Sequence, residues 1–146
     1  METPYLLLVI VHLVCAVIFG GAVAFEVLIL PELRKRVDQV TLHRVEDALE
    51  SRAVRILPFV LIVLYATGVL MLLRHFPNPS EIFNVSMGRW LSVKLALAAA
   101  VILAVATALT LFRFGRLTPE RTRVLHWFVF VCVMAILVLA KAMFYL

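Results

Sequence analysis

Four long apolar stretches constrain this chain more than any other feature of its sequence. They cover residues 5–30, 56–73, 90–112 and 124–146, and each is close to the roughly 20 residues that a helix needs to cross a bilayer. Inside lipid the backbone N–H and C=O groups have no water to bond, so such stretches must be helical. The sequence therefore predicts an all-α membrane protein with a single domain, residues 1–146, whose four transmembrane helices form an up-down-up-down bundle.

Composition supports this class and excludes others. The 146 residues are 64% hydrophobic and 16% charged, whereas soluble domains are only about half apolar. A net charge of +5 would suit nucleic acid, but these charges lie in short loops between apolar stretches, where they set orientation in the membrane instead. We therefore expect no nucleic-acid partner and take the lipid bilayer as the chain's surroundings.

The distribution of Lys and Arg predicts the orientation. Residues 31–55 hold six of them and residues 113–123 hold four, whereas the connection over residues 74–89 holds two. The positive-inside rule then places both basic loops in the cytoplasm and both termini outside, which in a bacterium means the periplasmic side of the inner (plasma) membrane. We expect the first stretch to be retained and not cleaved as a signal, because no Lys or Arg precedes it.

The connections and small residues suggest how the helices pack. Leu42, Val45 and Leu49 recur at helical spacing in the first basic loop, which predicts a short amphipathic helix lying at the interface. Pro58 is compatible with the first turn of the second span. Small residues allow neighbouring helices to approach closely, and they are Gly20, Gly21, Ala24, Ala66, Gly68 and residues 98–100.

Polar residues inside the spans are the candidate functional residues. At 1.5 Å per residue, four of them on four different helices share a layer about 6 to 10 Å below the outer surface: His12, Thr67, Lys94 and Lys141. Ionisable groups at such depth face the bundle interior or a wet cavity. Cys15 and Phe19 follow His12 at helical offsets, so this face of the first span should point inward. We expect His12, Lys94 and Lys141 to converge on one cavity in the outer half of the bundle.

Copper is one ligand that this layer suggests. Cu(I) prefers thioether and thiolate ligands and also accepts imidazole, and six such side chains lie in or near the outer half: His12, Cys15, Met71, His75, Met87 and Met143. No spacing such as MxxM or CxxC defines a site. The two lysines would repel a bare cation and suit an anionic group better.

Haem b is the alternative ligand. Two histidines on one iron need ring nitrogens about 4 Å apart, but His12 and His126 differ in depth by roughly 17 Å. A haem would therefore use His12 alone, or His12 with His75 or a ligand that is not histidine. The lysines would then meet the propionates, and Arg89 with Lys94 would hold an anionic group of the ligand.

Three segments together resemble the copper-resistance D (CopD) membrane domain family: "VHLVCAVIFGGAVAFEVLILPELRKR", "RILPFVLIVLYATGVLML" and "MGRWLSVKLALAAA". The resemblance covers residues 5–112 and is carried by His12, Gly20, Gly21, Pro31, Thr67, Gly68, Gly88, Arg89, Leu91 and Lys94. That family looks related to the HemJ-type protoporphyrinogen oxidases, four-helix proteins associated with haem b. Their first-helix histidine and third-helix lysine match His12 and Lys94, but Phe19 stands where a tryptophan is usual.

The resemblance implies a membrane protein that takes up or delivers copper across the inner membrane. Two alternatives stay open at this point: a haem b-binding oxidoreductase that acts on a porphyrin or a quinol, and an assembly subunit without chemistry whose polar residues only join helices. The sequence assigns no catalytic residue. It also leaves open whether the chain assembles with copies of itself or within a larger membrane complex.

Overall fold

A computed structural model describes residues 3–75 and 86–142, and every regular element in these two ranges is helical. The elements are α1 (Thr3–Ala24), a π-helical turn η1 (Phe25–Ile29), α2 (Leu30–Arg36), α3 (Gln39–His75), α5 (Ser86–Arg113) and α6 (Pro119–Ala142). Four helical rods are long and apolar enough to cross a membrane: Thr3–Arg36, Gln39–His75, Gly88–Arg113 and Pro119–Ala142. The expected all-α architecture with four candidate spans is confirmed.

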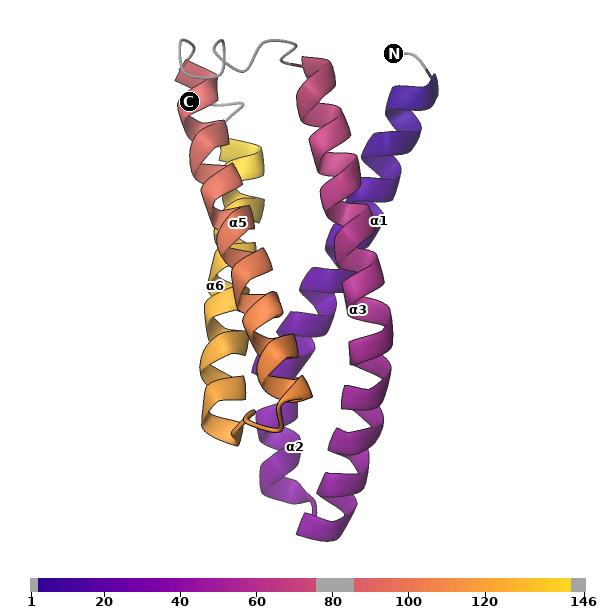
Figure 1. Ribbon diagram of the computed structural model, residues 1–146, viewed down its shortest axis with the longest axis vertical. Helices are drawn as coiled ribbons and strands as arrows, with labels where there is room; N and C mark the ends of the chain where they lie inside the picture. Colours follow the sequence, from indigo (N-terminus) through magenta and orange to yellow (C-terminus); the bar gives the residue numbers. More distant parts are fainter. Residues whose placement is uncertain (1–2, 76–85, 143–146) are drawn as a thin grey trace. The chain divides into compact units, whose positions relative to one another are not determined.

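The chain divides into two compact units, Met1–His75 and Phe76–Leu146. In the first unit α1 packs along α3 (Figure 1). The buried side chains of the rod Thr3–Arg36 recur at spacings of three and four residues: Cys15, Phe19, Val23, Val27 and Leu30. This spacing keeps side chains on one face of a helix. The inward direction expected for Cys15 and Phe19 is confirmed.

The first span does not end at Pro31, where the apolar stretch stops. The helix continues through η1 and α2 to Arg36, and Leu30 N–H bonds the carbonyl of Phe25, five residues back. In a regular α-helix, the Pro31 ring would press on the carbonyl of Val27, and its missing N–H would leave that carbonyl without a donor. The wider π-helical turn lies directly before Pro31 and accommodates both effects, so the helix is not broken there.

The first basic loop is largely helical as well. The expected interfacial helix is the first half of α3, which runs without interruption for 37 residues, or about 55 Å, nearly twice a bilayer core. Pro58, which the sequence allows in the first turn of the second span, is instead inside a helix. Leu30 and Leu42 are buried where α2 and α3 meet. Arg34 pairs with Glu46 across the two helices at 2.6 Å.

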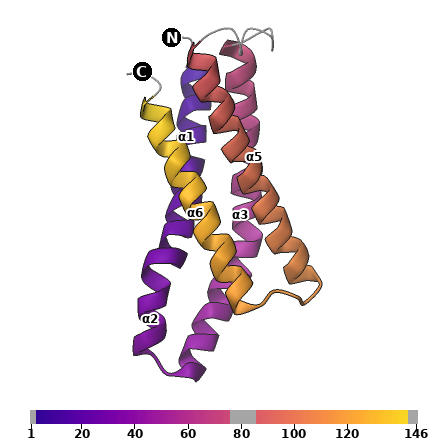
Figure 2. The same ribbon diagram turned by 90° about the vertical axis from the view of Figure 1, so that its left-hand side faces the viewer.

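The second unit is a helical pair, in which α5 packs along α6 (Figure 2). Among the described residues, its buried hydrophobic side chains are Val101 and Ala104 on α5 and Val129 and Cys132 on α6. At the end of α5, Gly115 adopts φ +62°, and the N–H groups of Gly115 and Arg116 bond the carbonyls of Phe112 and Leu111 at 3.1 and 2.9 Å. These two bonds form a Schellman motif, which ends the helix by satisfying its last carbonyls.

Thr118 begins the next helix. Its side-chain oxygen accepts a bond from the N–H of Arg121 at 3.4 Å, and its carbonyl accepts one from Thr122 at 3.0 Å. Pro119 occupies the first helical position, where a missing N–H costs nothing. A helix stop and a helix start therefore lie three residues apart, which makes the turn short.

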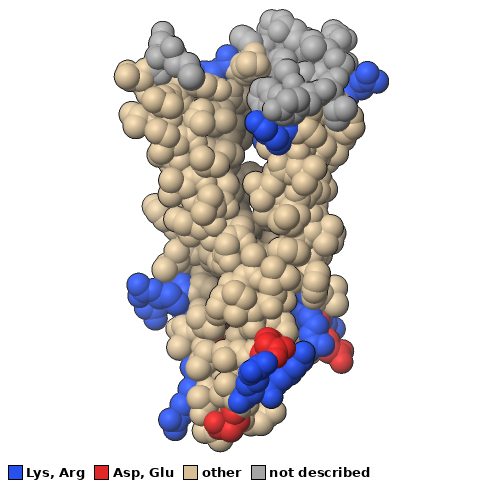
Figure 3. Space-filling view, turned by 180° about the vertical axis from the view of Figure 1, so that it is seen from behind, with Lys and Arg blue, Asp and Glu red and all other residues tan. Residues whose placement is uncertain are grey.

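The outer surfaces of the helices are apolar. Leu7, Phe59 and Leu103 are exposed by 62%, 68% and 68%, and Figure 3 shows the middle of the helices almost without charged side chains. Such surfaces would be costly in water and are stable in hydrocarbon. Lengths, composition and exposure together indicate a multi-pass membrane protein.

We predict that Gly115→Ala destabilises the α5–α6 turn by about 1 to 2 kcal/mol, because a Cβ is unfavourable at positive φ. Gly21→Ala is the matched control, since a Cβ there meets nothing within 4 Å and alanine favours a helix. The free energy of unfolding in mixed micelles, measured by titration with SDS, should fall for Gly115→Ala and stay level or rise for Gly21→Ala. Equal values for the two variants would contradict the turn geometry.

We also predict that the start of α3 depends on pH. Asp38 Oδ2 accepts a bond from the N–H of Thr41 at 3.0 Å, and this bond lowers the pKa of Asp38. A lowered pKa in the folded state means that the stabilisation is present above the ordinary aspartate pKa and is lost as pH falls through the folded value. Hydrogen exchange at Thr41 should therefore accelerate, relative to its intrinsic rate, at acid pH. Asp38→Asn, which still caps, should remove this pH dependence.

Candidate functional site

His12 on α1 contacts α3 through one ring nitrogen. Its Nδ1 lies 3.0 Å from the backbone carbonyl oxygen of Leu64 and 3.1 Å from Oγ1 of Thr67. Thr67 is 7% exposed and is the buried polar residue of the described core. The expectation that His12 and Thr67 share a layer is confirmed, because the two side chains touch.

These contacts favour one tautomer of the His12 ring. A carbonyl oxygen can only accept, so a hydrogen bond between Nδ1 and the Leu64 carbonyl requires the proton on Nδ1. Oγ1 of Thr67 lies 2.8 Å from the carbonyl of Val63 and 3.0 Å from that of Leu64. Its single proton goes to one of them, and its oxygen can accept from Nδ1. In the neutral imidazole the lone pair is therefore on Nε2.

Gly68 allows His12 to reach this position. A Cβ built on Gly68 would lie 3.1 Å from Cε1 and 3.6 Å from Nδ1 of the His12 ring, and the first distance is tighter than ordinary contact. Gly68, one of the small residues expected to permit close packing, therefore lies beside the imidazole of His12. Neither the role of Gly68 beside His12 nor the Leu64 carbonyl was identified from the sequence. The sequence signal for the role of Gly68 is its position next to Thr67, at the depth of His12.

The sulfur and histidine candidates on this unit lie at different heights. Cys15 is buried one turn from His12 on the same face of α1. Met71 is partly buried and His75 is exposed, one and two turns beyond Thr67, or about 6 and 12 Å along α3. Metal–nitrogen bonds are near 2 Å, so one ion cannot use His12 and His75 together in this hairpin. Met143 lies outside the described residues.

The second unit holds the basic candidates. Lys94 is partly buried and lies seven residues, two turns, before the buried Val101, so both share the face of α5 that packs on α6. Lys141 is exposed and follows the buried Cys132 by nine residues, or two and a half turns, which puts it on the opposite face of α6. Arg89 is exposed. Convergence of these groups with His12 stays a prediction, because His12 belongs to the other unit.

Within residues 3–75 and 86–142, no three or more side chains among His, Cys, Asp and Glu gather closely enough to hold a metal ion. A metal ligated by His12 would therefore need sulfur from methionine, a ligand outside this set, or a macrocycle that supplies most of the coordination. The hydrogen bonds of His12 fit such a role, because a ligating histidine usually donates its other ring N–H to a carbonyl or carboxylate.

Comparison with known proteins gives no relative: no protein-family model, curated protein or solved structure matches the chain.

We predict that neutral His12 is the tautomer protonated at Nδ1. In ¹⁵N spectra of the full-length protein in bilayers, its Nδ1 should show the shift of a protonated nitrogen and Nε2 that of an unprotonated one. The resonances are assigned by their loss in His12→Gln. Thr67→Val should move the Nδ1 shift without changing the tautomer, because the Leu64 carbonyl remains. A proton on Nε2 instead of Nδ1 would contradict the hydrogen bonds described here.

Proposed function

We propose that this chain is a four-helix protein of the bacterial inner membrane that handles copper, in uptake or delivery, with Nε2 of His12 as a ligand. One observation supports this most directly: Nδ1 of His12 bonds the Leu64 carbonyl at 3.0 Å, which directs the lone pair to Nε2. The bond also fixes the ring orientation, as bonds to the far nitrogen of ligating histidines do.

The neighbouring chemistry suits a soft metal ion. Cys15 lies one turn from His12, and Met71 lies one turn beyond Thr67. Imidazole with thiolate or thioether is a set that Cu(I) accepts. His75 then belongs to no first site with His12, and it is an outer ligand on the route of the ion. This proposal agrees with the resemblance of the motifs to the CopD family.

The proposed topology is up-down-up-down with both termini in the periplasm. It is supported by the ten basic residues at 31–55 and 113–123 against two at 74–89. The helical extension made by α2 and the first half of α3 then projects into the cytoplasm, and His12 lies in the periplasmic half. A periplasmic entry for copper follows from this depth.

A second candidate function is a haem b-binding oxidoreductase acting on a porphyrin or a quinol. It is favoured by one observation: among the described residues, no three or more His, Cys, Asp or Glu side chains gather closely enough to hold an ion. Haem iron needs only one or two protein ligands, because the macrocycle supplies four nitrogens. Lys94 and Arg89 would hold its anionic groups, which requires the two units to meet there.

The decisive experiment compares His12→Ala with His43→Ala, a matched histidine that is exposed in the polar half of α3. Protein purified from copper-supplemented cells should carry copper in the wild type and in His43→Ala, and His12→Ala should lose it. Thr67→Val should bind copper about tenfold more weakly, the lower end of effects seen when a ligand's supporting bond is removed. Copper content and an absorption spectrum of each variant are the measurements.

Each other outcome is informative. A Soret band that disappears in His12→Ala would show that the ligand of His12 is haem and not copper. Equal copper in all variants would overturn the role of His12. A colourless, copper-free wild type, in which His12→Ala lowers only the unfolding free energy, would show that the imidazole only joins two helices. Such a bond contributes on average only about 0.6 kcal/mol in membrane proteins.

A further inference from the structure

A groove lies between α5 and α6 near their connecting turn, wholly within the second unit. Its volume is about 380 Å³, and it is lined by Thr107 and Leu111 from α5 and by Glu120, Arg121, Val124 and Leu125 from α6. The groove is open to the outside, and Val124 on its wall is 68% exposed. It takes no part in the His12 site, which belongs to the other unit.

The floor and the rim of this groove differ in chemistry. Leu111, Val124 and Leu125 make an apolar floor, while Arg121 stands at the rim. Nη1 of Arg121 donates to the backbone carbonyl of Arg116 at 3.3 Å, so its guanidinium is held beside the turn. The hydroxyl of Thr107 is already used, since it donates to the carbonyl of Leu103 at 2.7 Å.

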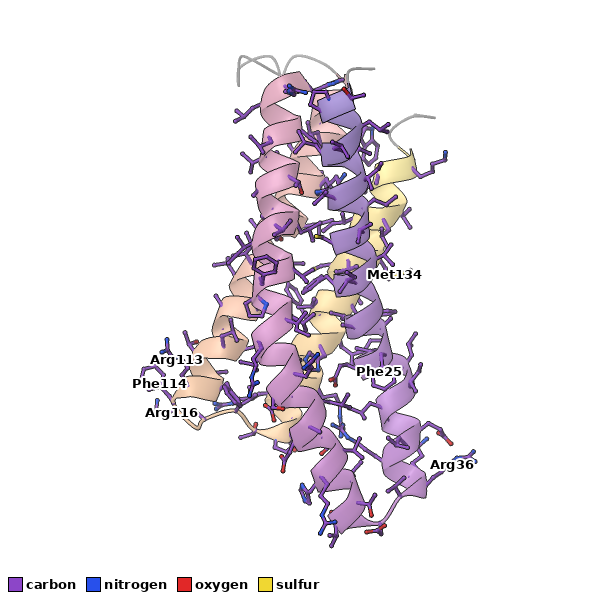
Figure 4. All side chains as sticks on the ribbon, turned by 90° about the vertical axis from the view of Figure 1, so that its right-hand side faces the viewer. Phe25, Arg36, Arg113, Phe114, Arg116 and Met134 are labelled. Atoms are coloured by element: carbon purple, nitrogen blue, oxygen red, sulfur yellow. The ribbon has the colours of Figure 1, made fainter. Side chains whose placement is uncertain are left out.

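The segment that joins α5 to α6 and supplies the charged lining residues Glu120 and Arg121 is strongly basic. Residues 113–123 contain four arginines and one acid, Glu120. The four arginines are exposed, and Figure 4 shows Arg113 and Arg116 together at the end of α5. The apolar parts of α5 and α6 end here, so this rim lies where spanning helices reach the lipid headgroups.

We propose that this groove binds an anionic phospholipid, with an acyl chain along the floor and the phosphate beside Arg121. The choice of occupant follows from charge. Glu120 and Arg121 line the groove, and the segment that contains them, residues 113–123, carries a net three positive charges. Basic segments between spanning helices suit acidic lipid headgroups. A zwitterionic lipid would bring a cationic amine to the same arginines. A soluble anion would gain nothing from the apolar floor.

The test uses native mass spectrometry of the full-length protein in detergent, with phosphatidylglycerol or phosphatidylcholine of the same acyl chains added at equal concentration. The wild type should retain phosphatidylglycerol preferentially. Arg121→Gln should weaken this binding about fivefold, as expected for one basic group near a headgroup. Arg52→Gln, which removes an exposed arginine of α3 in the first unit, is the charge-matched control and should leave it unchanged.

A second pair of variants tests the floor without altering charge. Val124→Trp fills the groove and should abolish the preference. Val138→Trp adds the same ring at a position of α6 that is 63% exposed and outside the groove lining, and it should have no effect. Equal losses in Arg121→Gln and Arg52→Gln would overturn the site in favour of net charge alone. Unchanged binding in Val124→Trp would show that another segment of the chain covers the groove.

Discussion

The structure depends on one constraint: in a hydrocarbon core, backbone polar groups can bond only within the protein. Each apolar stretch is therefore helical, and a polar side chain inside it needs a partner on its own helix or on a neighbouring one. For His12 these partners are the carbonyl of Leu64 and the hydroxyl of Thr67. The small bond energy in lipid means that this contact orients the ring more than it stabilises the helix pair.

At the helix ends, the same constraint is met by local chemistry. The carbonyls that end α5 are satisfied through the positive φ of Gly115, and α3 begins with the carboxylate of Asp38. Arg34 and Glu46 hold the polar halves of the first hairpin together. Because these bonds join residues close in sequence, each helical pair is built largely from its own segment.

Part of the candidate site was predictable from the spacing of residues along the chain. Depth along a helix is a fixed rise per residue, so the shared level of His12 and Thr67 was predictable, and the helical period gave the buried face of Cys15. The partner carbonyl of Leu64 was not predictable, because every residue has one. The direction of Lys141 was not predictable from depth alone: its nine-residue offset from the buried Cys132 places it on the opposite face of α6.

The sequence by itself determined the helical class, the four candidate spans and the ionisable groups within them, because apolar length and charge are properties of the chain that lipid selects directly. It did not determine where helices stop. Pro31 and Pro58 both lie within helical rods, and a π-helical turn directly before Pro31 accommodates its missing N–H. Only the tertiary structure decided which nitrogen of His12 carries the proton, because that depends on a carbonyl of another helix brought within 3.0 Å of the ring.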